Sequence, residues 1–200
     1  MVGLTQPDRF VGAPAVVEWI RAAFLEDDGP LFSEIHSHLR SASIGVLWTN
    51  ASNSRHGKRI VGQAEMTRNM GNHGAWQRAR MLCHLRELLG EVPDFLITLD
   101  SVYASQARDV EFAALIDHEL THCAQQEDEF GMPAFVKSTG MPKFCIKGHD
   151  VQEFVSVVRR FGIEAAGPEA VDMVIAAAQK PVIGKAKVAA ACGVCIRAVA

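Results

Sequence analysis

The chain has 200 residues, of which 48% are hydrophobic and 22% are charged. This length suits one domain with its own core, and the composition excludes a disordered, collagen-like or low-complexity chain. The formal net charge of −3 excludes a protein that is basic throughout, so a contact with nucleic acid would need a local basic patch.

The first half of the chain alternates between helical and extended patterns. Apolar residues at helical spacing predict an amphipathic helix over residues 13–27, which Gly29 and Pro30 end. The other elements expected here are a short helical piece at 31–40, strands at 44–49, 58–67 and 93–99, and a helix over 75–89. The polar turn between the first two strands favours a hairpin in which they pair with each other.

The second half is expected to hold the chemistry. The elements predicted there are a helix over 109–126, loop and short-strand material at 127–148, and helices over 150–161 and 168–179. We therefore expect one domain over residues 1–165 with its core at about 44–162. A C-terminal helix and a flexible tail would follow over residues 166–200.

Residues 118–122 read His-Glu-Leu-Thr-His, an H-E-x-x-H motif within the helix predicted over 109–126. Residues four apart lie on one face of a helix, so His118 and His122 can both direct an imidazole at one metal ion. Glu119 is displaced around the helix, where its carboxylate can reach a zinc-bound water without ligating the metal. It can then take the proton of that water as a general base and pass it to a leaving amine.

A catalytic zinc needs a third protein ligand and an open coordination position. His149 is the one histidine that follows His122 in the sequence, which makes it the leading candidate. Asp150 and Glu153 are the alternatives, although both fit a capping box in which their carboxylates are already occupied. The expected site is therefore one zinc ion per chain, held by His118, His122 and His149.

Two motifs carry a resemblance to a known family. The string DHELTHC, an acidic stretch, a Gly-Met-Pro turn and the string GHDVQEF resemble the phage metallopeptidase family, which comprises H-E-x-x-H zincins related to SprT-like zinc proteases. The resemblance covers roughly residues 44–162. It implies a small α+β, zincin-like fold, with a short mixed sheet packed on the active-site helix. It also implies that His149 is the third ligand, with Phe154 one residue later than in the commonest spacing.

Several other side chains have open assignments. Tyr103, Arg108 and Lys147 are candidates for stabilising transition-state charge, and the spacing selects none of them. Cys192 and Cys195 form a single C-x-x-C motif, which we interpret as two reduced thiols. The alternative is a metal site shared with Cys145 and His149. The residues expected in buried positions are Cys83, Cys123 and Met141, and those expected on the surface are His36, His38 and His56.

The charge is unevenly distributed along the chain. Residues 51–86 hold seven arginines and lysines against Glu65 alone, a local charge of +6. Such a segment is typical of a face that contacts DNA or an acidic partner, and equally of a solvated surface.

The five scattered cysteines are odd in number, which favours a reducing compartment over a disulfide framework. Residues 1–10 lack the apolar run of a secretion signal, and the apolar run at 188–196 is too short to span a membrane. We therefore expect a cytoplasmic protein, located in the host cytoplasm if a phage encodes it.

Two functions follow from these features. The first is a zinc-dependent metallopeptidase that cuts a protein or peptide substrate. The second is a non-catalytic, zinc-stabilised binding or regulatory protein of a phage or mobile element, acting on a host protein or a DNA-bound complex. Intact Glu119 favours the enzyme, because a purely structural zinc site has no use for a general base.

Overall fold

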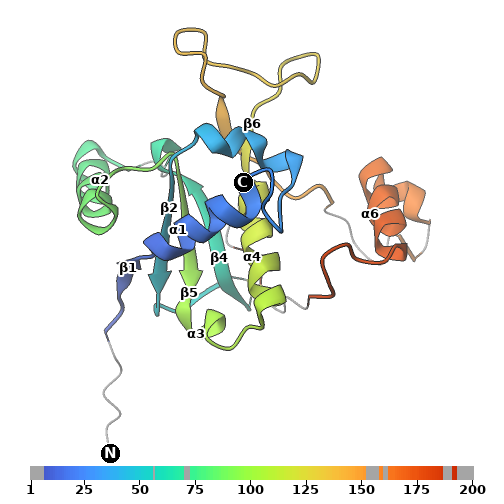
Figure 1. Ribbon diagram of the computed structural model, residues 1–200, viewed down its shortest axis with the longest axis horizontal. Helices are drawn as coiled ribbons and strands as arrows, with labels where there is room; N and C mark the ends of the chain where they lie inside the picture. The colour runs from blue at the N-terminus through green and yellow to red at the C-terminus, as the bar shows by residue number, and fades with distance from the viewer. Residues whose placement is uncertain are drawn as a thin grey trace, which may run out of the picture.

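The computed structural model describes residues 7–55, 57–69, 73–151, 158–159, 162–186 and 191–192. The helices are α1 (Pro14–Ile20), the π-helix η1 (Arg21–Leu25), the 3-10 helix η2 (Glu34–Ser41), η3 (Thr67–Asn69), α2 (Ala75–Leu89), α3 (Ser101–Ala104), α4 (Asp109–His122), η4 (Ile163–Ala166) and α6 (Pro168–Ala178). The strands are β1 (Phe10–Gly12), β2 (Ile44–Thr49), β3 (Asn53–Arg55), β4 (Lys58–Met66), β5 (Phe95–Asp100), β6 (Cys123–Gln125), β7 (Phe144–Ile146) and β8 (Ala191–Cys192). Figure 1 shows their arrangement.

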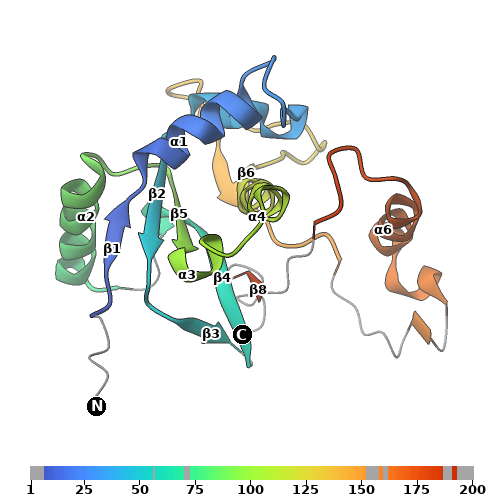
Figure 2. The same ribbon diagram turned by 60° about the horizontal axis from the view of Figure 1, so that its bottom comes forward.

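A mixed sheet forms the centre of the fold, in the order β1-β2-β5-β4-β3, with β8 also paired to β4. Strands β2 and β5 are parallel, from Ile44 opposite Phe95 to Thr49 opposite Asp100, and β4 runs antiparallel to β5. Helix α2 lies on one side of this sheet, while α1 and α4 lie on the other (Figure 2). The predicted α+β class, with a mixed sheet beside the helix that carries the H-E-x-x-H motif, is confirmed.

The core lies mainly between the sheet and the layer formed by α1, η1 and α4. Alternate residues of β2 and β5 face this layer, among them Val46, Phe95 and Ile97, and all three are fully buried. A smaller apolar cluster joins Leu85 of α2 to the opposite face of the sheet. Both faces of β2 and β5 are buried, which explains why the sequences of these strands are almost continuously apolar.

The expected hairpin between strands 44–49 and 58–67 is wrong. Strand β4 instead pairs with β5 and with β3, a short strand formed within the segment expected to be a polar turn. Both edges of β2 are already occupied, by β1 and by β5. The tight hairpin is therefore β3–β4, and a helix connects β4 to β5.

The helix predicted over 109–126 ends earlier, at His122. Residues 123–125 leave it to form β6, which pairs antiparallel with β7. The helix predicted over 13–27 divides into α1 and the π-helix η1, and the piece at 31–40 is the 3-10 helix η2. Most of the helix expected over 150–161 lies outside the described residues.

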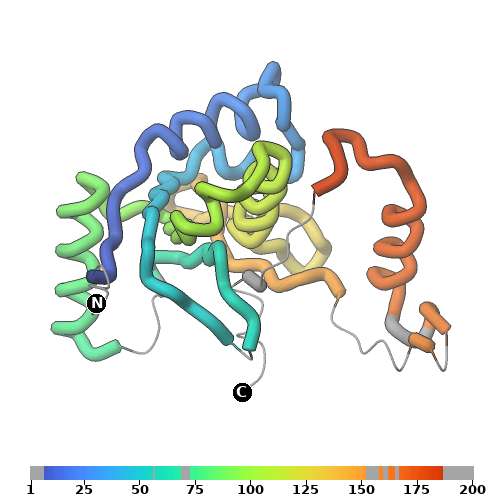
Figure 3. Tube along the Cα trace, turned by 90° about the horizontal axis from the view of Figure 1, so that it is seen from below, coloured from blue at the N-terminus to red at the C-terminus, as the bar shows by residue number. Residues whose placement is uncertain are grey.

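Helix α6 lies apart from the sheet, on the side of α4, as the tube in Figure 3 shows. Within the described ranges, no helix is long and apolar enough to cross a bilayer.

Candidate metal centre

Helix α4 crosses the sheet directly over β4, and a glycine permits the close approach. A Cβ atom at Gly62 would lie 2.5 Å from Oε1 of Glu119 and 2.9 Å from Cδ1 of Leu115. Both distances are shorter than van der Waals contact, so a larger residue at this position would displace one of the two side chains. The carboxylate of Glu119 consequently lies fully buried between α4 and β4.

The pairing of β6 with β7 brings the later part of the chain back to the end of α4. Cys123 lies opposite Ile146, and the next amide, that of Lys147, donates to the carbonyl of His122 at 2.9 Å. Nδ1 of His122 lies 2.6 Å from the Lys147 carbonyl. We assign the proton of His122 to Nδ1, because a carbonyl can only accept, and this leaves the lone pair on Nε2.

Three imidazoles converge beside this turn. Nε2 of His118 lies 3.2 Å from Nε2 of His122 and 3.3 Å from Nε2 of His149. One ligand nitrogen from each histidine falls within 4.8 Å of the other two, a grouping that could hold a metal ion. Two nitrogens on a tetrahedral zinc, each about 2.05 Å from the metal, are separated by about 3.3 Å, so the observed spacing fits this geometry.

Burial favours the neutral form of His118 and His122, which is the form that binds metals. Burial lowers the pKa of His118 to about 4, with further lowering from the nearby His122 and His149. Burial also lowers the pKa of His122, against the opposing effect of its bond to the Lys147 carbonyl. His122 is buried, His118 is half-buried and His149 is exposed, so the cluster opens to solvent on the His149 side.

The other candidates from the sequence lie elsewhere or have local partners. The Asp150 carboxylate pairs with the Lys147 ammonium at 2.7 Å. Arg108 pairs with Glu111 at the start of α4, about 15 Å along the helix axis from His118 at 1.5 Å per residue. Burial raises the pKa of Tyr103, which belongs to α3 near that same end. Glu153, Phe154 and Cys195 fall outside the described residues.

Two histidines expected on the surface contact α4 or the residue that follows it. His36 is only 1% exposed, and its Nε2 lies 2.8 Å from Oδ1 of Asp117. Nε2 of His38 lies 2.7 Å from the carbonyl of Cys123. The surface expectation is wrong for His36, and no local signal could have corrected it, because the partner is 81 residues away.

The expectations for buried residues are partly wrong. Cys123 is buried, as predicted, and burial raises the pKa of its thiol. Cys83 is exposed on α2, and Met141 is 40% exposed in a loop, so both of these expectations fail. Helix α2 covers the sheet with only a narrow apolar stripe, which leaves Cys83 on its solvent side.

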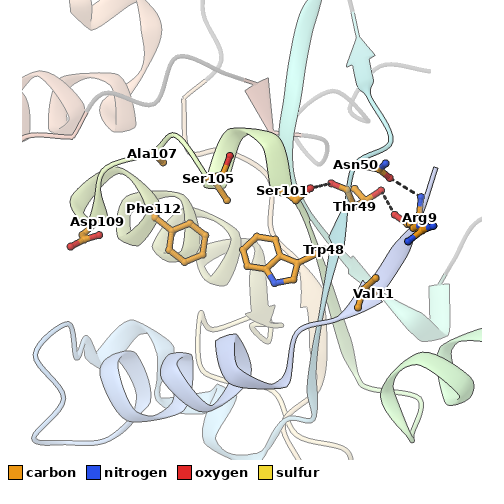
Figure 4. A pocket seen from close by; sticks show the side chains of 11 residues that line it. Arg9, Val11, Trp48, Thr49, Asn50, Ser101, Ser105, Ala107, Asp109 and Phe112 are labelled. Carbon is orange, nitrogen blue, oxygen red and sulfur yellow. Dashed lines mark hydrogen bonds between the residues drawn. The ribbon is translucent and has the colours of Figure 1, made fainter. Parts of the chain in front are cut away.

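A cavity of about 700 Å³ lies away from the histidines, at the N-terminal end of α4 (Figure 4). The rings of Trp48 and Phe112 stack along its wall, with centroids 5.9 Å apart. Polar groups around it bond to one another: the Thr49 hydroxyl donates to the Arg9 carbonyl, and the Ser101 hydroxyl donates to the Thr49 carbonyl. This cavity is therefore mainly apolar and lacks a cluster of ligand atoms.

The basic segment 51–86 is partly neutralised by acidic residues outside it. Arg59 pairs with the buried Asp100 at 2.6 Å, and Arg68 pairs with Asp94 at 3.2 Å. Contact with DNA through this segment stays a prediction.

Comparison with known proteins connects this geometry to a family. The sequence model of one family, described as putative phage metallopeptidase, matches residues 17–179. No curated protein and no solved structure matches the chain. The relation to SprT-like proteases stays a prediction. Because the match covers most of the chain, including α4 and all three converging histidines, the protein belongs to the phage metallopeptidase family.

Proposed function

We propose that this protein is a zinc-dependent peptidase in which His118, His122 and His149 hold the metal and Glu119 is the general base. The convergence of three imidazoles, with ring nitrogens 3.2 and 3.3 Å apart, in a member of a metallopeptidase family, carries the proposal. Protein or peptide substrates follow from that class of activity.

The donor set is suited to zinc. Three imidazole nitrogens with a further position open to solvent match the common catalytic arrangement of zinc, and hard cations such as Mg²⁺ prefer oxygen ligands. When bound, zinc supplies a Lewis acid that polarises the substrate carbonyl and lowers the pKa of a water to about 7. The bond from His122 to the Lys147 carbonyl holds that ring in the tautomer the metal requires.

Glu119 supplies the proton transfer. Its carboxylate follows the first ligand in the motif and is held between α4 and β4 beside Gly62. In this place it takes a proton from the attacking water and returns it to the leaving amine. The peptide approaches from the side of the exposed His149, where the cluster opens to solvent.

A second candidate function has one observation in its favour. Glu119 is 0% exposed, which also suits a non-catalytic, zinc-stabilised protein that binds a host protein or a DNA-bound complex. The two candidates differ in whether the carboxylate of Glu119 is needed for an activity or only for packing.

The test replaces one carboxylate at a time on the same helix. Purified protein is analysed for zinc by mass spectrometry and incubated with casein and with a quenched peptide library. We expect about one zinc per chain and measurable cleavage. Glu119→Gln should keep the zinc and lose about 100- to 10,000-fold in rate, whereas Glu111→Gln, the matched control on α4, should keep both. A zinc-loaded wild type that cuts neither substrate, or a fully active Glu119→Gln, overturns the peptidase proposal.

The third ligand is tested separately. His149→Ala should lose most of the zinc, whereas Asp150→Ala should keep it. Full zinc retention in His149→Ala would show that another side chain completes the site.

A further inference from the structure

The 3-10 helix η2 contacts both ends of the segment that carries the metal ligands. Nε2 of His36 bonds Asp117, the residue before His118, at 2.8 Å. Nε2 of His38 bonds the carbonyl of Cys123, the residue after His122, at 2.7 Å. The two bonds therefore enclose the segment 117–123 from its beginning to its end.

The contact with Asp117 is made by a histidine that has no access to solvent. His36 is 1% exposed, and its ring packs edge to face against Phe24 with centroids 6.5 Å apart. The side chain of Asp117 is 52% exposed and could be hydrated without this partner. The carboxylate does not need this bond for its hydration, so we interpret the bond as a restraint on the position of α4.

The contact with Cys123 fixes the point at which α4 ends. Cys123 is the C-cap of α4, and its carbonyl belongs to the orphan acceptors that every helix end exposes. Nε2 of His38 donates this bond, because a carbonyl can only accept, and burial lowers the pKa of the ring. The turn that holds His122 is thus anchored from η2 on one side and from the Lys147 carbonyl on the other.

We propose that His36 and His38 are positioning residues, which brace the segment 117–123 and thereby set where the ring nitrogens of His118 and His122 lie. The inference rests on the proposed metal site and does not require peptide hydrolysis. Groups that orient metal ligands typically change metal affinity by about 10- to 100-fold when removed.

The experiment measures metal binding rather than turnover. The 200-residue chain is stripped of metal and titrated with Zn²⁺ against a chromophoric chelator, and the visible absorption of the Co²⁺-loaded form reports the ligand geometry. His38→Ala should weaken Zn²⁺ binding about 10- to 100-fold and alter the Co²⁺ spectrum. His38→Gln, whose amide nitrogen can donate from nearly the same place as Nε2, should restore most of the affinity and the wild-type spectrum.

Removal of the partner of His36 provides a second variant that opens no buried cavity. Asp117→Ala should weaken Zn²⁺ binding about 10-fold, because the bond to His36 is lost. The side chain of Asp117 is half-exposed, so its removal leaves no buried cavity. His84→Ala is the control, since His84 is exposed on α2 and pairs only weakly with Glu87, at 3.7 Å. It should leave the affinity and the spectrum unchanged.

The outcomes separate this inference from the function on which it rests. If His38→Ala and Asp117→Ala lower the resistance to urea but keep the wild-type Zn²⁺ affinity and Co²⁺ spectrum, the two histidines are structural only and the proposal is overturned. If the wild type itself binds neither ion, the proposed metal site fails. Altered metal binding in a protein that cuts no substrate supports the brace while contradicting the peptidase.

Discussion

The two ends of α4 differ in what their side chains offer. At the C-terminal end, three imidazoles each place one ring nitrogen within 4.8 Å of the other two. At the N-terminal end, a cavity of about 700 Å³ is walled by stacked aromatic rings, and its hydroxyl groups donate to nearby carbonyls. The cavity is thus at the end without a ligand set, and the convergence of like donor atoms is a better guide to chemistry than a cavity.

The difference originates in what packs against each end. The histidine end receives η2 and β7, which come from segments before and after α4 and restrain its last turn. The cavity end receives Trp48 and the start of α3, which form a wall of rings and small residues. One helix therefore has histidines clustered at its C-terminal end and a largely apolar cavity at its N-terminal end.

The largest expected contrast comes from truncating one ring at each end. His118→Ala removes one of the three proposed metal ligands. If about 10–16 kcal/mol of zinc binding is shared among the ligands, this weakens zinc on the order of 1,000-fold. Trp48→Ala should leave zinc affinity unchanged and lower the free energy of unfolding by about 2–3 kcal/mol, because the half-buried ring loses its contact with Phe112. Chelator competition and urea unfolding measure the two effects. Loss of zinc in Trp48→Ala would show that the ends are not independent.

A second pair of variants compares a glycine that contacts Glu119 with one that does not, and neither variant alters a histidine. Gly62→Ala places a methyl group 2.5 Å from Oε1 of Glu119 and should reduce kcat about 10- to 100-fold while zinc stays bound. Gly45→Ala is the matched control in the same sheet. Its new methyl group would meet Leu89 and Pro93, both at 2.7 Å, far from the carboxylate.

Both variants should lose about 1–3 kcal/mol of unfolding free energy through overpacking. Only Gly62→Ala should lose kcat beyond that effect. Equal kcat values in the two variants would contradict the role proposed for Glu119.

The third contrast is in pH dependence. The pKa of His118 is lowered from 6.5 to about 4 in the folded chain. The unfolded chain therefore takes up a proton at higher pH than the folded chain does. The metal-free protein should be fully stabilised by this group above pH 6.5 and lose that stability as the pH falls toward 4.

Urea unfolding between pH 4 and 8 measures this slope, and His118→Asn should flatten it by removing the titrating ring. No histidine lines the cavity at the other end of α4, so a variant there, Trp48→Ala, should keep the wild-type slope.

The smallest expected effect concerns the short helix beside the cavity. Asp100 accepts hydrogen bonds from the amides of Val102 and Tyr103 at the start of α3 and pairs with Arg59. Asp100→Ala should cost about 1–2 kcal/mol of unfolding free energy through loss of this cap. Zinc affinity should be unaffected, and a changed affinity would mean that the two ends of α4 are coupled.

Local patterns predicted much of this molecule. Strand β2 and helix α6 lie where apolar periodicity and their turn residues place them, within about one residue. The motif predicted that His118 and His122 share one face of a helix, because i and i+4 neighbours are set by helix geometry alone.

Where prediction failed, the deciding contacts lie far apart in the chain. The expected hairpin fails because β5, which comes about 30 residues after β4, takes the place beside it. The helix over 109–126 stops at His122 because β7 offers Cys123 a strand partner that propensity does not reveal. His36 is misjudged as a surface residue because the groups that bury it come from other elements.

The sequence by itself determined the family resemblance, the α+β class and two histidines on one helical face, since each depends on residues within a few turns of one another. Only the tertiary structure decided that His149 meets this pair, that η2 bonds to both ends of the segment 117–123, and that a cavity lies at the opposite end of α4. These outcomes depend on which strands pair and which faces pack. Strand pairing and packing depend on how much apolar surface the whole chain buries, and no single segment determines this.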